Sequence, residues 1–190
     1  MKKRYITASE LLKESFALAI KILESGFRPT FIVAVWRGGT PIGIAVQEVL
    51  DVCGVKANHI AIRTSSYKGI GEREREVRVH GLGYVVENIR DTDSLLIVDD
   101  VHDSGLSVAE LIHQIHTRCG RHAPEDIKVA TVYYKPGMSK VNSVPDYYMQ
   151  ETDDWLVFPH ELEGLSRQEL MAEKPEIAHI VDQLQKYIKT

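Results

Sequence analysis

The sequence predicts an α/β fold with a mostly parallel central sheet flanked by helices. Three observations support this prediction: apolar runs of strand length recur along the chain, stretches with helical spacing lie between them, and glycine or proline marks the junctions. Strands separated by helices generally pair in parallel, because each crossover helix returns the chain to the same end of the sheet. With 190 residues the chain can bury one core, and we expect a single domain over residues 1–190.

The first half of the chain supplies two helices and two strands to this fold. Apolar side chains recur at helical spacing over residues 8–25, and a glycine and a proline then end the helix. The apolar run FIVAV at 31–35 predicts a buried strand, which a glycine turn connects to a helix over 41–54. Pro41 fits the first turn of that helix, where a missing N–H group costs little. HIAIR at 59–63 predicts a second strand.

Residues 64–84, TSSYKGIGEREREVRVHGLGY, are rich in glycine and charge and predict a long loop or a mobile hairpin. In an extended chain, Arg73 and Arg75 would share one side, with the glutamates at 72, 74 and 76 on the other. This alternation suits a hairpin that closes over a polyanion, and a solvated run of charges explains it nearly as well. Which arginine would reach a ligand stays open.

The second half of the chain continues the alternation of strands and helices. SLLIV at 94–98 predicts another buried strand, and residues 107–118 predict the helix behind it. The runs at 127–134 and 155–158 supply further strands, and the tail over 175–187 is expected to be helical. No internal repeat or low-complexity tract interrupts the pattern.

Charge and composition limit the classes of function. The formal net charge of −4 and the pI near 6.1 argue against a general nucleic-acid binder, which usually carries a basic excess. No apolar run approaches the length needed to span a bilayer, so we expect no membrane partner. Cys53 and Cys119 show no CxxC spacing, which fits a reduced, cytoplasmic compartment.

The stretch LLIVDDVHDSGLSV at 95–108 is the strongest candidate for a site. It runs from an apolar strand into Asp99 and Asp100, and ligands of open α/β sheets bind beyond the carboxyl ends of strands. The turn that follows combines a glycine, two hydroxyls and the amino end of a helix, a ready cradle for a phosphate. Carboxylates accept hydrogen bonds from vicinal hydroxyls and also suit hydrated Mg²⁺. The stretch therefore predicts a receptor for a phosphorylated sugar with a metal nearby.

A purely structural interpretation of the same turn is that Asp103 or Ser104 caps the following helix. Three aspartates within five positions favour the ligand site over this alternative. The spacing G-x-x-x-x-G-K-[ST] is absent, which argues against a nucleoside triphosphatase.

These residues resemble a known family. LLIVDDVHDSGLS resembles the phosphoribosyl pyrophosphate motif of the type I phosphoribosyltransferases, with Ser104 and Ser107 where threonines are commoner. AVWRGG at 34–39 resembles the loop that binds pyrophosphate, and RTSSYKGIGERERE resembles the mobile lid with its Ser-Tyr pair. VYYKP and DDWLVFPHE resemble the purine-recognition segments of the 6-oxopurine members, and the resemblance covers residues 30–161. It implies the type I phosphoribosyltransferase fold, with a small hood region and a lid loop.

The resemblance also implies a role for each segment. Phosphoribosyl pyrophosphate would bind through its pyrophosphate to the arginine turn, through its ribose hydroxyls to the acidic pair and through its 5′-phosphate to the serine turn. The residues assigned to it are Arg37, Gly38, Gly39, Ser66, Tyr67, Arg73, Asp99, Asp100, Asp103, Ser104, Gly105, Leu106 and Ser107. Those assigned to a purine base are Lys135, Trp155, Leu156 and Val157.

The implied reaction transfers phosphoribosyl to hypoxanthine, guanine or xanthine in purine salvage and releases pyrophosphate. Asp103 would be the catalytic residue, because it can accept a proton from the imidazole edge of the base. Mg²⁺ is the implied cofactor, with Asp100 and Glu161 as its carboxylates. The resemblance further implies a homodimer or homotetramer.

Several alternatives stay open at this point. The base could be adenine or a pyrimidine, although a lysine at position 135 favours a 6-oxo group over a 6-amino group. Lys135 could instead be a solvated strand end, and Trp155 a core aromatic. The chain could also be a non-catalytic sensor of phosphoribosyl pyrophosphate, against which the presence of both Asp103 and Arg37 argues.

Overall fold

The computed structural model describes residues 3–68, 75–184 and 186–187. The chain divides into two compact units, which we call the core unit (residues 12–153) and the terminal unit (residues 1–11 and 154–190). The expectation of a single domain over 1–190 stays a prediction.

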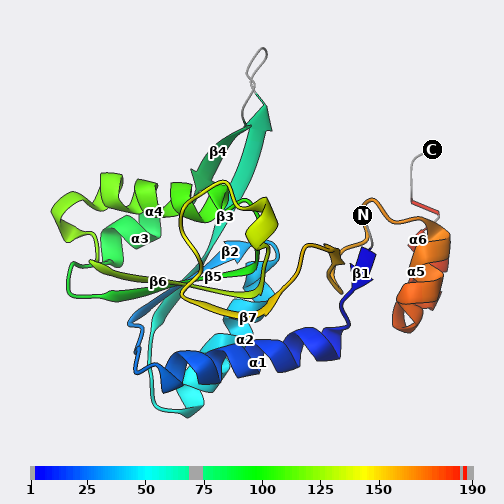
Figure 1. Ribbon diagram of the computed structural model, residues 1–190, viewed down its shortest axis with the longest axis horizontal. Coiled ribbons are helices and arrows are strands. Elements are labelled where there is room, and N and C mark those ends of the chain that lie inside the picture. Colours follow the sequence, from blue (N-terminus) through cyan, green and yellow to red (C-terminus); the bar gives the residue numbers. More distant parts are fainter. Residues whose placement is uncertain (1–2, 69–74, 185, 188–190) are drawn as a thin grey trace. The chain divides into compact units, whose positions relative to one another are not determined.

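The core unit contains a six-stranded sheet in the order β4-β3-β2-β5-β6-β7. Neighbouring strands are parallel except β3 and β4, which form an antiparallel hairpin (Figure 1). The sheet therefore confirms the predicted α/β class. Its strands are β2 (Phe31–Trp36), β3 (Asn58–Lys68), β4 (Arg75–His80), β5 (Ser94–His102), β6 (Asp126–Tyr134) and β7 (Tyr147–Glu151).

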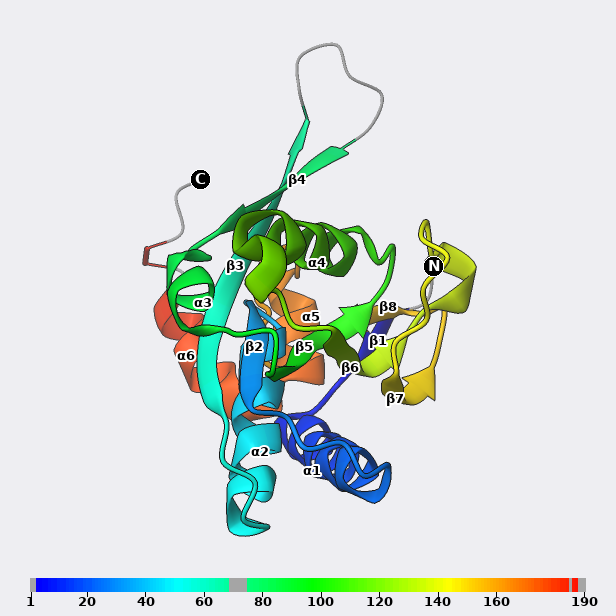
Figure 2. The ribbon, with the colours of Figure 1, turned by 90° about the vertical axis from the view of Figure 1, so that its left-hand side faces the viewer.

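Helices cover both faces of this sheet. Figure 2 shows α1 (Ala8–Glu24) and α2 (Gly39–Val52) on one side, with α3 (Gly83–Asn88) and α4 (Leu106–Cys119) on the other. Short 3₁₀ turns follow α4 (Gly120–His122) and β6 (Pro136–Met138). No described helix is both long and apolar enough to cross a membrane.

An apolar cluster packs the strands against α3 and α4. Each fully buried large aliphatic side chain in such a cluster stabilises the fold by roughly 1.5–3 kcal/mol. Its buried members are Phe31, Val33, Val35, Ile62, Leu82, Val85, Ile89, Leu95, Ile97, Val108, Leu111, Ile115, Cys119, Ala123 and Val129.

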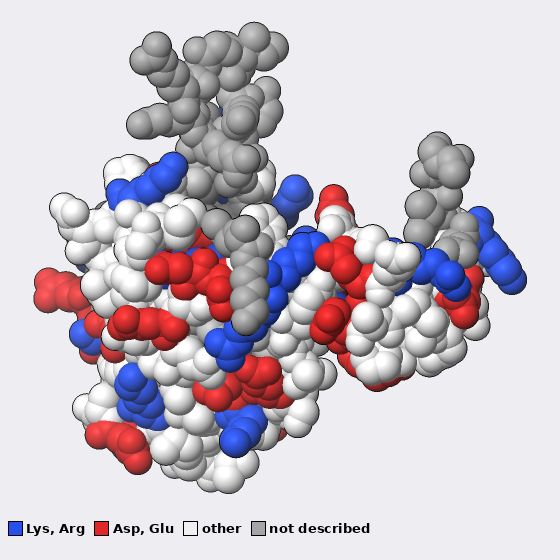
Figure 3. Space-filling view, turned by 45° about the vertical axis from the view of Figure 1, so that its right-hand side comes forward, with Lys and Arg blue, Asp and Glu red and all other residues white. Residues whose placement is uncertain are grey.

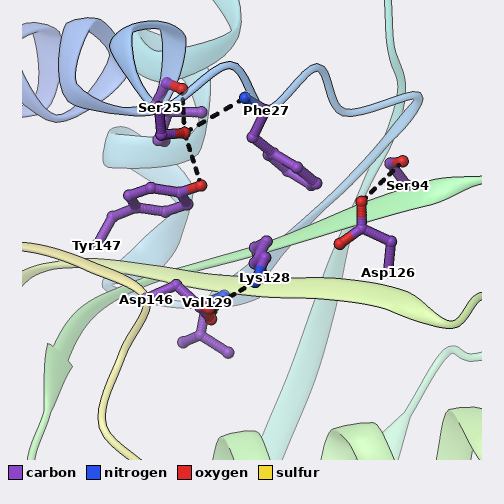
Figure 4. A network of polar contacts seen from close by, with 9 residues as sticks. Ser25, Phe27, Ser94, Asp126, Lys128, Val129, Asp146 and Tyr147 are labelled. Atoms are coloured by element: carbon purple, nitrogen blue, oxygen red, sulfur yellow. Dashed lines mark hydrogen bonds and ion pairs between the residues drawn. The ribbon is translucent and has the colours of Figure 1, made fainter.

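Polar contacts fasten the amino end of the sheet (Figure 4). After α1, the Ser25 hydroxyl donates to the carbonyl of Ile22 and lies 2.8 Å from the Tyr147 hydroxyl, which ties the helix to the edge strand β7. Just before β7, the Asp146 carboxylate accepts hydrogen bonds from Lys128 Nζ at 3.0 Å and from the Val129 amide at 2.9 Å. These side chains satisfy one another within the fold.

The terminal unit pairs β1 (Lys3–Tyr5) with β8 (Trp155–Val157) in parallel and adds α5 (Arg167–Glu173), a 3₁₀ turn (Pro175–Ile177) and α6 (Ala178–Leu184). Ser166 and Glu169 form a capping box at the start of α5. The Glu169 carboxylate also accepts hydrogen bonds from Lys3 Nζ and from the Tyr5 hydroxyl. The helix is therefore joined to β1.

Three sequence predictions need correction or completion. The strand expected at 94–98 continues to His102, because Asp99, Val101 and His102 still pair with β6. The segment 64–84 is a hairpin at its base, where β3 reaches Lys68 and β4 begins at Arg75. The strand expected at 155–158 lies outside the central sheet, where it pairs with β1. The short elements β1, β7, α3 and α5 carry too few periodic residues to have been predicted.

Candidate active site

The glycine turn, Arg37–Gly38–Gly39, packs directly on the acidic pair, Asp99 and Asp100. A Cβ atom on Gly38 would lie 1.7 Å from Asp100 Oδ2, and one on Gly39 would lie 2.8 Å from Asp99 Cα. A side chain at position 39 would meet backbone atoms, and one at position 38 would displace the Asp100 carboxylate, so the turn after β2 rests against the end of β5. The two strands are parallel neighbours, which brings their carboxyl ends together. The Trp36–Arg37 peptide bond in this turn is cis.

The two carboxylates of the pair have different surroundings. Burial, followed by the negative charge of Asp100, raises the pKa of Asp99 well above its usual range. Asp99 Oδ1 accepts a hydrogen bond from the Asp100 amide at 2.9 Å, and Asp100 Oδ1 accepts one from the Val101 amide at 2.8 Å. These local bonds hold both side chains in place. A hydroxyl donor or a cation would relieve the repulsion between them.

The serine turn forms a small cavity at the start of α4. Gly105 adopts the left-handed conformation with φ +75°, and a Cβ there would lie 2.3 Å from Val141 Cγ2. Glycine is therefore required at this position. The cavity has a volume of about 80 Å³, and its lining includes two of the three aspartates, Asp99 and Asp103, and both serines. The residues around it are Asp99, Val101, His102, Asp103, Ser104, Gly105, Ser107 and Val108.

Neither Asp103 nor Ser104 is the N-cap residue of α4, because that position is Gly105. The Ser104 side chain still reaches the helix, since the Leu106 amide donates to Ser104 Oγ at 3.5 Å. Amide groups in the first turn of a helix need partners from outside it. An anion bound in this turn could supply such partners, and the predicted phosphate site stays a prediction.

Asp103 and Lys135 form an ion pair that links the ends of β5 and β6. Lys135 Nζ lies 3.4 Å from Asp103 Oδ2, and the Lys135 amide donates to the His102 carbonyl at 2.9 Å. Lys135 is only 7% exposed, which contradicts the alternative of a solvated strand end. The Asp103 side chain is 44% exposed, so it can still reach a ligand.

Two buried threonine hydroxyls near these residues have no hydrogen-bond partner within the described part of the chain. Thr40 directly follows the glycine turn, and Thr131 pairs in register with Asp99. Buried polar groups in proteins are nearly always hydrogen-bonded, so such atoms indicate where water or a polar ligand binds. Neither threonine belongs to the residues predicted as a site from the sequence. For Thr40 the signal was its place immediately after Arg-Gly-Gly.

A magnesium ion fits the donor set at this end of the sheet. Mg²⁺ is usually held by one or two carboxylates together with water and substrate oxygens. Within the part of the chain that the structure describes, no three His, Cys, Asp or Glu side chains converge into a complete metal site. Asp99 and Asp100 could supply the one or two carboxylates, and water and substrate oxygens would complete the coordination of Mg²⁺.

The structure does not unite all predicted residues. Ser66 and Tyr67 lie in β3, but their side chains, like the whole of Arg73, are outside the described part of the structure. Glu161 belongs to the terminal unit, where its carboxylate accepts a hydrogen bond from the Phe158 amide at 3.0 Å. A joint metal site of Asp100 and Glu161 therefore stays a prediction.

The predicted base-binding segment forms β8 of the terminal unit. Trp155 is 57% exposed, so the alternative of a core aromatic is wrong. The side chains of Leu156 and Val157 are buried, which leaves their backbone groups as the parts that could read a ligand.

The core unit thus brings the glycine turn, the acidic pair and the serine turn to the carboxyl end of an open α/β sheet, where ligands of such sheets bind. A family profile described as phosphoribosyl transferase domain matches residues 4–167, and the chain belongs to this family. The resemblance to the type I phosphoribosyltransferases is confirmed. Members of the family generally use phosphoribosyl pyrophosphate and a base as substrates, with Mg²⁺.

Solved structures share the fold. A purine phosphoribosyltransferase from Pyrococcus horikoshii is 28% identical over 87% of this chain and 98% of that one, with a TM-score of 0.67. A hypothetical protein from Neisseria gonorrhoeae with bound ppGpp is 21% identical over 94% and 97%, with a TM-score of 0.72. The xanthine-guanine-hypoxanthine phosphoribosyltransferase of Helicobacter pylori is 19% identical over 85% and 95%, with a TM-score of 0.67. No curated protein matches the chain by sequence.

Proposed function

We propose that this protein transfers the 5-phosphoribosyl group of phosphoribosyl pyrophosphate to hypoxanthine, guanine or xanthine and releases pyrophosphate. The observation that carries the proposal is the packing of the Gly38–Gly39 turn on Asp99 and Asp100, beside the cavity of the serine turn. Those segments match the three parts of the donor substrate: pyrophosphate, ribose hydroxyls and 5′-phosphate. The similarity to a purine phosphoribosyltransferase from Pyrococcus horikoshii supports a purine as acceptor.

The reaction forms a bond between a ring nitrogen of the base and C1′ and breaks the bond between C1′ and pyrophosphate. Negative charge grows on the leaving group, where the Arg37 guanidinium and the amides of the glycine turn would bind it. Asp100, with Glu161 as the proposed second carboxylate, would hold Mg²⁺, which would supply positive charge to offset part of this negative charge. Asp99 and Asp100 would accept hydrogen bonds from the ribose hydroxyls.

Asp103 and Lys135 divide the handling of the base. The Asp103 carboxylate would accept the proton that leaves the imidazole edge as the new bond forms. The Lys135 ammonium, 3.4 Å from Asp103 and nearly buried, would donate to the 6-oxygen. An adenine amino group would meet a second donor there, so adenine should be disfavoured. Trp155 would stack on the ring.

Pyrophosphate release decides the proposal. The protein should be incubated with phosphoribosyl pyrophosphate, Mg²⁺ and, separately, hypoxanthine, guanine, xanthine, adenine, uracil and orotate. We expect pyrophosphate and a nucleoside monophosphate with at least one 6-oxopurine. Turnover with adenine should be at least tenfold lower than with that 6-oxopurine. Turnover with adenine or a pyrimidine alone would refute the proposed acceptor, and no turnover with any base would refute the enzyme. A cytoplasmic location and a homodimer or homotetramer remain part of the proposal.

A further inference from the structure

Lys174 is a buried lysine within the terminal unit. The residue is only 3% exposed, although lysine is almost never fully buried unless it is paired. Its amide donates to the Leu170 carbonyl at 3.0 Å, which places it at the end of α5. Its ammonium donates to the carbonyl of Phe158 at 2.5 Å and to that of Pro159 at 3.0 Å. Both acceptors are backbone groups of the turn that follows β8.

The same turn is held from its other side by Glu161. The Glu161 amide donates to the Phe158 carbonyl at 3.0 Å, and the Glu161 carboxylate accepts from the Phe158 amide at 3.0 Å. Both peptide groups of Phe158 are therefore fixed, and the Phe158 carbonyl receives Lys174 as a second donor. Burial lowers the pKa of Lys174, whereas the nearby Glu161 charge raises it. An uncompensated buried ammonium would be costly, and the two carbonyls and this carboxylate offset that cost.

The turn directly continues the segment assigned to the base. Val157 ends β8, and its carbonyl accepts a hydrogen bond from the Ile6 amide at 2.9 Å. Because the Leu156 and Val157 side chains are buried, these two residues can contact a base only through their backbone, whose direction the next peptide groups set. The position of a backbone contact depends on the neighbouring peptide groups rather than on the side chain of the same residue. The Lys174 ammonium, which fixes the turn, would therefore set the position of this contact.

We propose that Lys174 is a positioning residue that sets affinity for the purine base by fixing the carbonyls of Phe158 and Pro159. The proposal deepens the function stated above and rests on it. The Lys174 ammonium donates to carbonyls of the turn that continues the base segment, so its loss should act on the base and spare phosphoribosyl pyrophosphate.

The test compares Lys174→Met with Lys174→Arg and with Lys13→Met, which removes an exposed lysine from α1. We expect Lys174→Met to raise KM for the base tenfold or more, with KM for phosphoribosyl pyrophosphate within twofold of the parent. Lys174→Arg should recover at least part of the loss, and Lys13→Met should match the parent. An unchanged base KM, or an equal rise of both KM values, overturns the proposal.

Trp155 supplies a readout that does not depend on turnover. In a Trp36→Phe background, the fluorescence of Trp155 reports on β8 alone, because the chain has two tryptophans. Lys174→Met should shift this emission, and identical emission would overturn the proposal. If Lys174→Met does not fold, Lys174→Gln, which keeps one donor, takes its place under the same criteria. Loss of turnover in the parent protein with every base would refute the proposed function instead.

Discussion

At the amino end of the core sheet, Asp146 accepts hydrogen bonds from Lys128 and the Val129 amide, whereas at the carboxyl end Asp99 lies partly buried beside another carboxylate. The two aspartates are the same residue type with opposite surroundings. The first is satisfied by the fold, and the second is held against its neighbour's charge. The polar groups at the amino end of the sheet bind one another and stabilise the fold. The carboxyl end retains polar groups that a ligand would satisfy.

The largest effect that would test this comparison is on catalysis. Asp103→Asn should lower kcat by roughly 10²–10⁴, because the amide cannot accept the proton of the base. Asp146→Asn is the matched control at the opposite end and should leave kcat within twofold. Steady-state kinetics with the preferred 6-oxopurine measure both, and a comparable loss in the control would break the comparison. A sensor protein would show normal sugar-phosphate binding in both variants and no turnover in the parent.

The next effect is on donor binding. Gly38→Ala would place a methyl carbon 1.7 Å from Asp100 Oδ2, so the turn or the carboxylate must move. KM for phosphoribosyl pyrophosphate should rise on the order of tenfold, since misplaced binding groups lose rate steeply. Gly83→Ala, where a Cβ would meet nothing within 4 Å, should have no effect. Equal KM values in the two variants would show that the turn and the acidic pair act independently.

The next effect is a loss of stability at the amino end. Asp146→Ala removes the acceptor for Lys128 and for the Val129 amide, and we expect the free energy of unfolding to fall by about 1–2 kcal/mol. The ion pair is partly exposed, so most of this loss comes from the amide left without a partner. Urea denaturation monitors the change. A variant as stable as the parent would mean that this end is not fastened by its polar contacts.

The smallest expected effect is a pH dependence at the carboxyl end. An acid whose pKa is raised by folding stabilises the fold below its usual pKa, and this contribution is lost as pH rises through the raised value. Asp99 is such a group, so ionised Asp99 should destabilise the ligand-free protein at neutral pH. Asp99→Asn should therefore gain stability at pH 7 and lose that advantage towards pH 4. The opposite trend in unfolding curves would contradict the assigned surroundings of Asp99.

The sequence predicted the parts of the fold that have strong periodicity. The buried strands at 31–35 and 127–134 and the helix behind the serine turn were recovered within a few residues. The strand β7 was missed because its five residues alternate weakly, and its place in the sheet depends on the contacts of Asp146 and Tyr147. Such tertiary contacts leave no local signal.

The same limit applies to the site. Asp99, Asp100 and the serine turn could be predicted because one continuous motif carries them. The contact between Gly38 and Asp100 joins residues 62 positions apart, and only the parallel pairing of β2 and β5 creates it. Lys174 offered no signal at all, because a lysine in a charged tail is ordinarily solvated. On the face shown in Figure 3, acidic and basic side chains are interspersed.

The extension of β5 through both aspartates has a geometric consequence for any ligand. Consecutive side chains of a strand point to opposite faces, so Asp100 lies against the turn that opens α2 and Asp99 lines the cavity at the start of α4. A molecule that touches both must straddle the strand. A compact ring with neighbouring hydroxyls can do so, whereas a flat or linear compound reaches one side only, so the pleat itself becomes a filter for molecular shape.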